Sequence, residues 1–209
     1  MSKYARTLLA LVGATIVLSA LVSGASAGRL STSSRNIRAT WSSLEFIEPL
    51  GTTVRCPLTL EGSLHSSTIA KVLGALIGHI SRGTINDAVC SGGRFTILQA
   101  SLPWHVRYNG FVGTLPNITA LKTSVIGMSY RSATPAGICL FTSTAAQPLQ
   151  LDFSRSTVTR ALTAATVGGP MTSNEGCGPF GTRITLTLGG TSNVPTVLGG
   201  AAAITITLI

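Results

Sequence analysis

Apolar and polar residues alternate one by one along several stretches of this chain, and this period of two is the feature that most limits its fold. Alternation places one set of side chains in a core and the other in water, as in a half-buried β-strand. Many of the polar positions are threonine, whose β-branched side chain suits an extended backbone. The clearest examples are residues 54–61, 104–108, 184–188 and 204–209.

Turn-forming residues separate these stretches at short intervals, for example at Asn109-Gly110, Pro116-Asn117 and Gly199-Gly200. Short strands separated by such turns are typical of antiparallel sandwiches and barrels. A parallel sheet would need long connecting helices, and the sequence pattern shows none. We therefore expect an all-β fold, an antiparallel β-sandwich or barrel.

One stretch breaks the alternation and predicts a helix. Its apolar residues recur at helical spacing, at Ile69, Val72, Leu73, Leu76 and Ile77. Thr68 suits the N-cap position, although Gly74 weakens a helix by up to about 1 kcal/mol. We expect one short helix near 68–77 that runs into a strand near 78–86.

The composition excludes a disordered chain, because 44% of the residues are hydrophobic and the mean hydropathy is +0.45. Charged residues make up only 10%, against roughly 25% in an average soluble protein. Ser and Thr supply 45 of the 182 residues from Gly28 onward. Their hydroxyl groups give the expected strands a polar face in place of charges.

The first 27 residues have the order of a secretory signal peptide. Lys3 and Arg6 precede an uncharged stretch over residues 8–22, and Ala25-Ser26-Ala27 forms a small-residue cleavage site. We expect cleavage after Ala27, a flexible polar lead-in over 28–37, and a single β domain over 38–209. The alternative is an uncleaved membrane anchor, since roughly 20 apolar residues can span a bilayer.

Four cysteines, Cys56, Cys90, Cys139 and Cys177, follow the expected cleavage site, and none forms a C-x-x-C pair. An even number in an exported chain indicates two disulfides, for which three pairings exist. We favour Cys56–Cys90 and Cys139–Cys177, because each pair encloses a compact unit of similar length. Four buried free thiols are the alternative.

Residues that could carry chemistry are few. His65, His79 and His105 match no compact metal-ligand spacing, and no phosphate-binding loop is present. A Ser–His–Asp triad draws its members from distant positions, so the many hydroxyl residues neither support nor exclude one. We expect no catalytic, cofactor-binding or metal site, and we expect that the protein is not an enzyme.

The chain is strongly basic, with a formal net charge of +9. After removal of residues 1–27, thirteen basic and six acidic residues leave +7. The basic residues are spread out, apart from a mild cluster at Arg29, Arg35 and Arg38. Alternation over 104–108 separates aromatic from basic side chains, so we expect no specific nucleic-acid binding. Acidic envelope polymers or anionic lipid are the partners that net charge favours.

Three local motifs carry a resemblance. They are Thr53-Val54-Arg55-Cys56-Pro57-Leu58-Thr59-Leu60-Glu61-Gly62, Leu102-Pro103-Trp104 and Cys177-Gly178-Pro179. With them the chain resembles a group of small exported actinobacterial proteins of unassigned function. More remotely, its layout is similar to that of the exported alkane-oxidation activator family, from which the expected helical insert between Cys56 and Cys90 departs. The resemblance implies an exported all-β protein and supplies no catalytic residues.

The leading functional hypothesis is an exported, non-enzymatic β-sandwich protein. Its role would be structural, adhesive or ligand-binding, at the cell envelope or in the medium. One alternative is an exported hydrolase with a dispersed Ser–His–Asp site. Another is a membrane-associated β-assembly.

Overall fold

The alternating stretches do form strands, and the fold is all-β with antiparallel pairing, as the sequence predicts. The structure is a computed structural model that describes residues 28–48, 51–134, 137–175, 177 and 182–209. Two short 3-10 helices, η1 (Asp87–Val89) and η2 (Gln99–Ser101), lie between strands. The strands are β1 (Leu30–Thr32), β2 (Asn36–Ile47), β3 (Thr53–Leu64), β4 (Thr68–Ile69), β5 (Leu76–Ile85), β6 (Arg94–Ile97), β7 (Trp104–Thr114), β8 (Asn117–Ile126), β9 (Ser129–Thr134), β10 (Gly137–Thr142), β11 (Leu149–Arg155), β12 (Leu162–Thr172), β13 (Thr185–Thr191), β14 (Thr196–Val197) and β15 (Ile206–Leu208).

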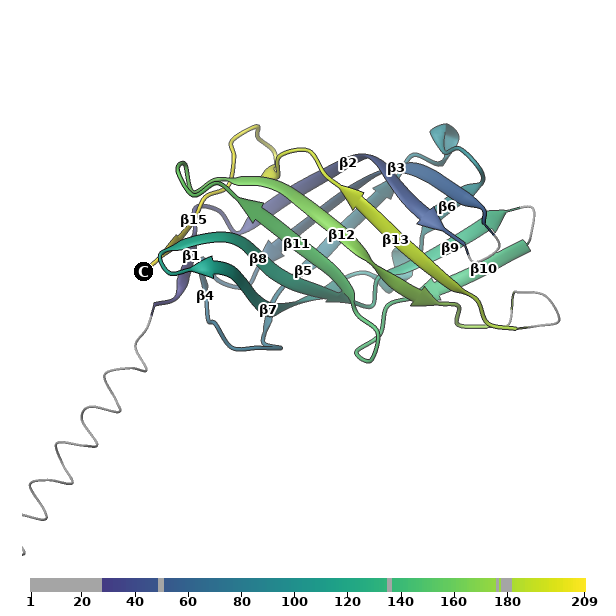
Figure 1. Cartoon of the computed structure of the whole chain (residues 1–209). Helices are drawn as coiled ribbons and strands as arrows, with labels where there is room; N and C mark the ends of the chain where they lie inside the picture. The colour runs from purple at the N-terminus through teal and green to yellow at the C-terminus, as the bar shows by residue number, and fades with distance from the viewer. Residues whose placement is uncertain (1–27, 49–50, 135–136, 176, 178–181) are drawn as a thin grey trace, which may run out of the picture.

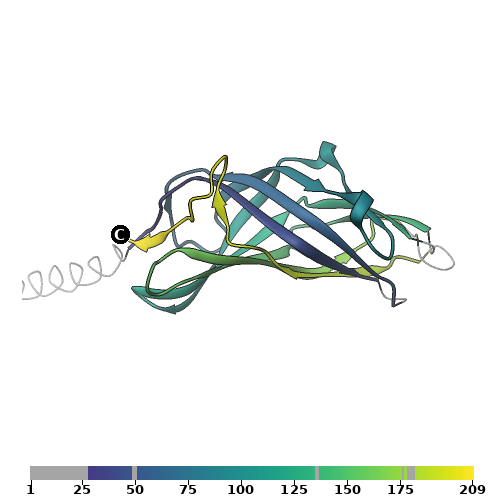
Figure 2. The same ribbon diagram turned by 90° about the horizontal axis from the view of Figure 1, so that it is seen from above.

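The large sheet closes on itself into a barrel. Within the described residues its strand order is β13-β12-β11-β8-β7-β5-β3-β2, and β13 also pairs with β2 through Leu188 and Phe46. If the small strands inserted between them are left aside, each of these eight strands is hydrogen-bonded to the next one along the chain. The short strand β14 also pairs with the start of β2. Of the two expected architectures, the structure is therefore the barrel (Figures 1 and 2).

The barrel interior is apolar because the alternation directs every second side chain inward. On β7, Trp104, Val106 and Tyr108 are buried, whereas His105 and Arg107 are exposed. This is the orientation that the sequence predicts. Most of the other strands follow the same rule, with Thr or charged residues on the outside of β3 and β13 and Asp152 on the outside of β11. Arg155 is the exception on β11, because it is buried at an inward position.

An aromatic cluster fills the end of the barrel beside the small sheet β10-β9-β6, here called the far sheet. Phe46 stacks on Phe95 with ring centroids 3.9 Å apart, and Tyr130 makes edge-to-face contacts with Phe46 and Trp104. Gly83 makes room for this cluster, because a Cβ there would lie 2.6 Å from Cδ1 of Ile97 and 3.5 Å from the Trp104 ring.

A second small sheet, β15-β1-β4, covers the opposite end of the barrel and is here called the lid sheet. It lies at the end of the molecule that holds the C-terminus (Figure 1). The prediction of a flexible lead-in over 28–37 is wrong, since β1 and the start of β2 fall within it. Leu30 is fully buried and pairs with both Leu208 and Ile69, so strands distant in sequence fix this segment.

The predicted helix near 68–77 is also wrong. β4 occupies Thr68–Ile69, a turn follows, and β5 begins at Leu76. The turn is held against β7, where Gly74 N–H donates to the Tyr108 carbonyl at 2.7 Å. Gly74 has φ +76°, which a helix cannot accommodate. Tertiary pairing thus overrides the helical spacing, and Leu73 points into solvent instead of forming a buried face.

Both predicted disulfides are present, Cys56–Cys90 and Cys139–Cys177. The first joins β3 to the segment after η1, and the second joins β10 of the far sheet to the segment before β13. Disulfides of this kind form in oxidising compartments. No helix within the described residues is long and apolar enough to cross a membrane.

Candidate functional site: an apolar cavity under the lid sheet

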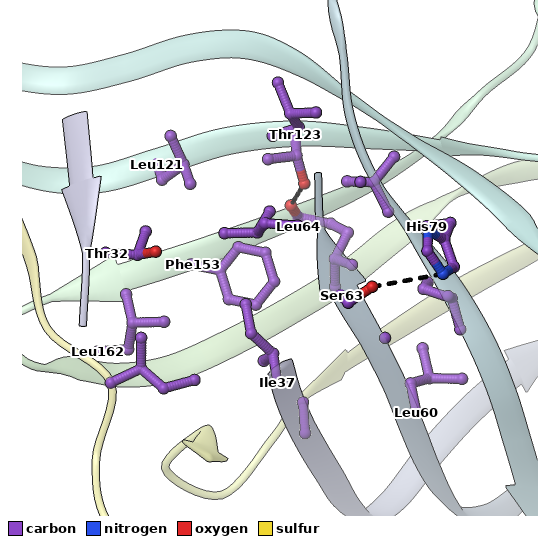
Figure 3. A pocket seen from close by; sticks show the side chains of 18 of the residues that line it. Thr32, Ile37, Leu60, Ser63, Leu64, His79, Leu121, Thr123, Phe153 and Leu162 are labelled. Carbon is purple, nitrogen blue, oxygen red and sulfur yellow. Dashed lines mark hydrogen bonds between the residues drawn. The ribbon is translucent and has the colours of Figure 1, made fainter. Parts of the chain in front are cut away.

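A cavity of about 50 Å³ lies inside the barrel beneath the lid sheet (Figure 3). Its wall comes from side chains that the alternation points inward, including Leu60, Leu121, Phe153 and Leu162. Its cover comes from Thr32 of β1 and from Ile204 and Ile206, next to and within β15. The cavity therefore exists only because the two ends of the β domain meet over the barrel.

Small residues leave room for the cavity at this end of the barrel. Ala39 is the inward residue of β2 above Trp41, so the strand presents a methyl group where an aromatic ring would fill the space. Gly62 and Gly78 bring β3 and β5 close together, since a Cβ on Gly62 would lie 2.4 Å from the carbonyl oxygen of His79. The aromatic side chains that fill the far end are absent from these positions.

Two buried hydroxyl groups at the cavity are already bonded to main-chain carbonyls. Thr123, buried on β8, donates its hydroxyl hydrogen to the carbonyl of Leu151. Thr32 of the lid donates to the Ser67 carbonyl at 3.5 Å. With these hydroxyl groups engaged, the wall presents mainly hydrocarbon, which suits an apolar occupant.

A buried cation lies one inward position beyond the cavity on β11. Arg155 is 6% exposed, and its Nε and Nη1 donate to the carbonyls of Ile206 and Ile118 at 2.7 and 2.6 Å. Burial lowers the pKa of this guanidinium, and Arg160 nearby lowers it further. Among the described residues no carboxylate forms an ion pair with Arg155. Its role is to tie the lid strand β15 to the barrel.

One serine–histidine pair lies at the border of the cavity, on the neighbouring strands β3 and β5 (Figure 3). Ser63 Oγ and His79 Nε2 are 3.3 Å apart. A catalytic triad also needs a carboxylate to orient the histidine. Glu61 is the acidic residue nearest in sequence, and Arg38 holds its carboxylate at 2.7 Å.

The three histidines considered as metal ligands come to neighbouring positions. His79 is paired in register with His105, and the rings of His65 and His79 have centroids 5.7 Å apart. In the part of the chain that the structure describes, no three His, Cys, Asp or Glu side chains are grouped closely enough to hold a metal ion.

The basic cluster of the sequence does not stay together as one site. Arg38 pairs with Glu61, whereas Arg29 and Arg35 are exposed near the lid sheet. The remaining acids are held separately, as in Arg55–Glu45 at 2.8 Å and Lys122–Asp152 at 2.6 Å.

The surface of the described residues also has wider hollows, among them one of about 340 Å³ and one of about 320 Å³. The first lies between β5 and β6, and the second lies beside the Cys139–Cys177 disulfide. Much of the surface that lines both hollows is polar, whereas the surface that lines the cavity under the lid is almost entirely apolar.

Sequence reasoning missed the cavity. Alternation identifies the inward residues of each strand, but the lid comes from segments at opposite ends of the β domain. The local signal that could have indicated the lid is an apolar residue, Leu30, within the polar stretch 28–36, and the structure shows this residue fully buried. Comparison with known proteins finds no matching family, curated protein or solved structure.

Proposed function

We propose that the protein is an exported, non-enzymatic binding protein that holds a small apolar molecule inside its barrel. The observation that carries the proposal is the hydrocarbon-lined cavity between the barrel and the lid sheet. Engineered apolar cavities of about 150 Å³ stay dry and take up benzene or xenon. A cavity of about 50 Å³ holds only a small group, so a longer ligand requires the lid sheet to move.

Export is the second part of this proposal. It is supported by the two disulfides and by the basic, apolar and small-residue order of residues 1–27, which lie outside the described residues. Mass spectrometry of the protein from the culture medium should find Gly28 as the first residue. Secreted protein that still begins with Met1 would contradict cleavage after Ala27.

The cavity is tested with a variant that fills it. Leucine at position 39 places three further carbon atoms in the space above Trp41. In a methyl-detected NMR titration with hexane, the wild type should show shifts for the methyl groups of Leu60, Leu121 and Leu162. We expect Ala39→Leu to abolish these shifts.

Ala120→Leu is the matched control, because Ala120 lies on β8 one position before the inward Leu121 and its side chain points outward. It should bind hexane as the wild type does. Hexane binding that persists in folded Ala39→Leu, or shifts confined to other methyl groups, would place the ligand elsewhere and contradict the proposal.

A hydrolase is the second candidate, and the Ser63–His79 hydrogen bond is the observation that favours it. If the protein is a hydrolase, a fluorophosphonate probe, which labels activated serines, modifies Ser63. The labelling is then lost in Ser63→Ala and kept in the control Ser81→Ala, which removes an exposed hydroxyl group from the outer side of the neighbouring strand β5. Our own proposal predicts no labelling of the wild type or of either variant, so labelling that depends on Ser63 would favour the hydrolase.

A further inference from the structure

Exposed apolar side chains gather on three connections at the lid end of the barrel. The connections are the turn before β5 with the first residue of that strand (70–76), the β7–β8 hairpin (111–117) and the β11–β12 turn (156–161). Together they are here called the lid-end rim. The exposed apolar residues on it are Val72 (61% exposed), Leu73 (75%), Leu76 (47%), Val112 (45%), Leu115 (38%) and Val158 (87%).

The three connections are neighbours around the barrel. The strand order β5-β7-β8-β11-β12 places them in this sequence along one rim. The first is bound to β7, where Tyr108 N–H donates to the Ala75 carbonyl at 2.9 Å. The second and third are linked by the pairing of Ala120 on β8 with Ser154 on β11. Figure 1 shows the β7–β8 hairpin and the β11–β12 turn at the end of the barrel that holds the C-terminus.

The same rim is basic and carries no acidic residue. Lys71, Arg107 and Arg160 lie on or beside it, and Arg107 and Arg160 are exposed. The sequence has no Asp or Glu over 62–86, 88–151 or 153–174. The two nearest acids in sequence, Glu61 and Asp152, are neutralised by ion pairs with Arg38 and Lys122.

We propose that the lid-end rim docks the protein on an anionic lipid bilayer. Apolar side chains on adjacent turns enter the interface between headgroups and acyl chains, while the cations beside them are attracted to acidic headgroups. A second copy of the chain is disfavoured, because two basic rims would repel each other. A water-soluble acidic polymer would use the cations and leave the apolar tips without a partner.

The proposal is independent of the hexane test, because docking depends on the outside of the rim and not on the cavity. It also specifies where the proposed binding protein acts, namely at the surface of a bilayer. A docked rim brings the lid sheet next to the bilayer, where an apolar ligand would be found.

Flotation with phospholipid vesicles tests the docking. At low salt, we expect the full chain to float with vesicles of phosphatidylcholine and phosphatidylglycerol and not with phosphatidylcholine alone. Replacing Val72 and Leu73 together by Ser should lower the partition coefficient at least about tenfold, since both exposed side chains lose their contact with lipid. Arg160→Gln should lower it about fivefold.

Matched controls come from the far sheet at the other end of the barrel. Ile138 is 58% exposed on β10, and Arg131 is an exposed cation on β9. Ile138→Ser and Arg131→Gln should bind vesicles as the wild type does. The wild type and all variants are compared in the same form of the chain, so any affinity of residues 1–27 for lipid affects each of them equally.

Four outcomes would overturn the proposal. They are equal loss in the far-sheet controls, binding to phosphatidylcholine alone that matches binding to the anionic vesicles, absence of flotation in the wild type, and a wild-type dimer in solution that the Val72 and Leu73 substitutions dissociate. Urea melts of each variant establish that the compared proteins are equally folded.

Discussion

At the scale of single residues, Trp104 shows how many core contacts one inward side chain of a strand makes. Its side chain is fully buried, its ring makes an edge-to-face contact with Tyr130, and its Nε1 donates to Ser101 Oγ at 2.7 Å. Arg107 lies on the same strand with the opposite orientation. The two residues therefore separate the inner from the outer face of β7.

We predict that Trp104→Ala destabilises the protein by about 3–5 kcal/mol, because it leaves a large cavity in a packed core. Arg107→Ala should change the free energy of unfolding by less than about 0.5 kcal/mol. A pair of urea melts gives both values. A larger loss of stability in Arg107→Ala than in Trp104→Ala would mean that the strand faces the other way.

Tyr130 gives a prediction for alkaline pH. Its side chain is fully buried with the hydroxyl group 3.0 Å from the Met128 sulfur, and burial raises its pKa far above 10. Because the folded pKa is raised, the unfolded chain releases this proton first. Stability is then complete below about pH 10 and falls above it by roughly 1.4 kcal/mol per pH unit.

The measurement is a urea melt of the wild type and of Tyr130→Phe at pH 8 and at pH 11. The wild type should be the more stable at pH 8, and its advantage should shrink or reverse at pH 11. Burial raises the pKa of Tyr108 as well, so part of the alkaline loss should remain in the variant. An advantage that does not change with pH would show that Tyr130 does not titrate in this way.

At the scale of elements, the disulfides hold segments that the main barrel does not pair. Their cysteines are 34 and 38 residues apart. By the chain-entropy account, replacing both members of either pair by Ser should cost about 3–4 kcal/mol, with similar values for the two. Urea melts measure the cost, and non-reducing peptide mapping identifies the pairs. Four thiols that can be alkylated in native protein would contradict both disulfides.

The lid strand β15 depends on Arg155. Replacing this residue with Met keeps much of the buried stem but leaves the carbonyls of Ile206 and Ile118 without their donor. Each unsatisfied buried carbonyl costs roughly 1–3 kcal/mol. We predict faster hydrogen exchange of the Ile206 amide, which donates to the Arg160 carbonyl.

Arg82→Met is the control, because Arg82 is 70% exposed and lies 3.9 Å from Glu61. It should leave exchange in β15 unchanged and stability within about 0.5 kcal/mol. Unchanged exchange in Arg155→Met would show that the lid is held by its strand pairing alone.

At the scale of the whole molecule, closure of the barrel depends on the seam between β13 and β2. Trp41 Nε1 donates to the carbonyl of Gly190 across it at 3.2 Å. A Cβ on Gly190 would lie 2.8 Å from Cδ1 of the buried Leu44, whereas a Cβ on the adjacent Gly189 would meet nothing within 4 Å. Two neighbouring glycines thus test the seam from its inner and outer sides.

We predict that Gly190→Val destabilises the protein by about 1–3 kcal/mol through overpacking at the seam. Gly189→Val should be neutral or stabilising by up to about 1 kcal/mol, because a β-branched residue suits an exposed strand position. Chemical denaturation distinguishes them. Equal effects would mean that β13 and β2 do not pack as closely as the structure shows.

The inward and outward faces of the strands could be predicted from residue order, because alternation is a local property of extended backbone. Alternation places Trp104, Val106 and Tyr108 in the core, and the structure shows them buried. The disulfide pairs followed from the spacing of the four cysteines. The helix near 68–77 could not be corrected locally, because helical spacing of apolar residues does not reveal that Gly74 pairs with β7.

The sequence by itself determined the class of the fold and the core face of its strands, since both are encoded by a period of two, and the spacing of its cysteines favoured the disulfide pairing that the structure has. Only the tertiary structure decided that the sheet closes between β2 and β13 and that β1, β4 and β15 cover one end. These contacts join segments up to 178 residues apart, as in the pairing of Leu30 with Leu208. A local pattern of residues carries no information about a strand partner so distant in sequence. The cavity and the lid-end rim arise from that closure alone.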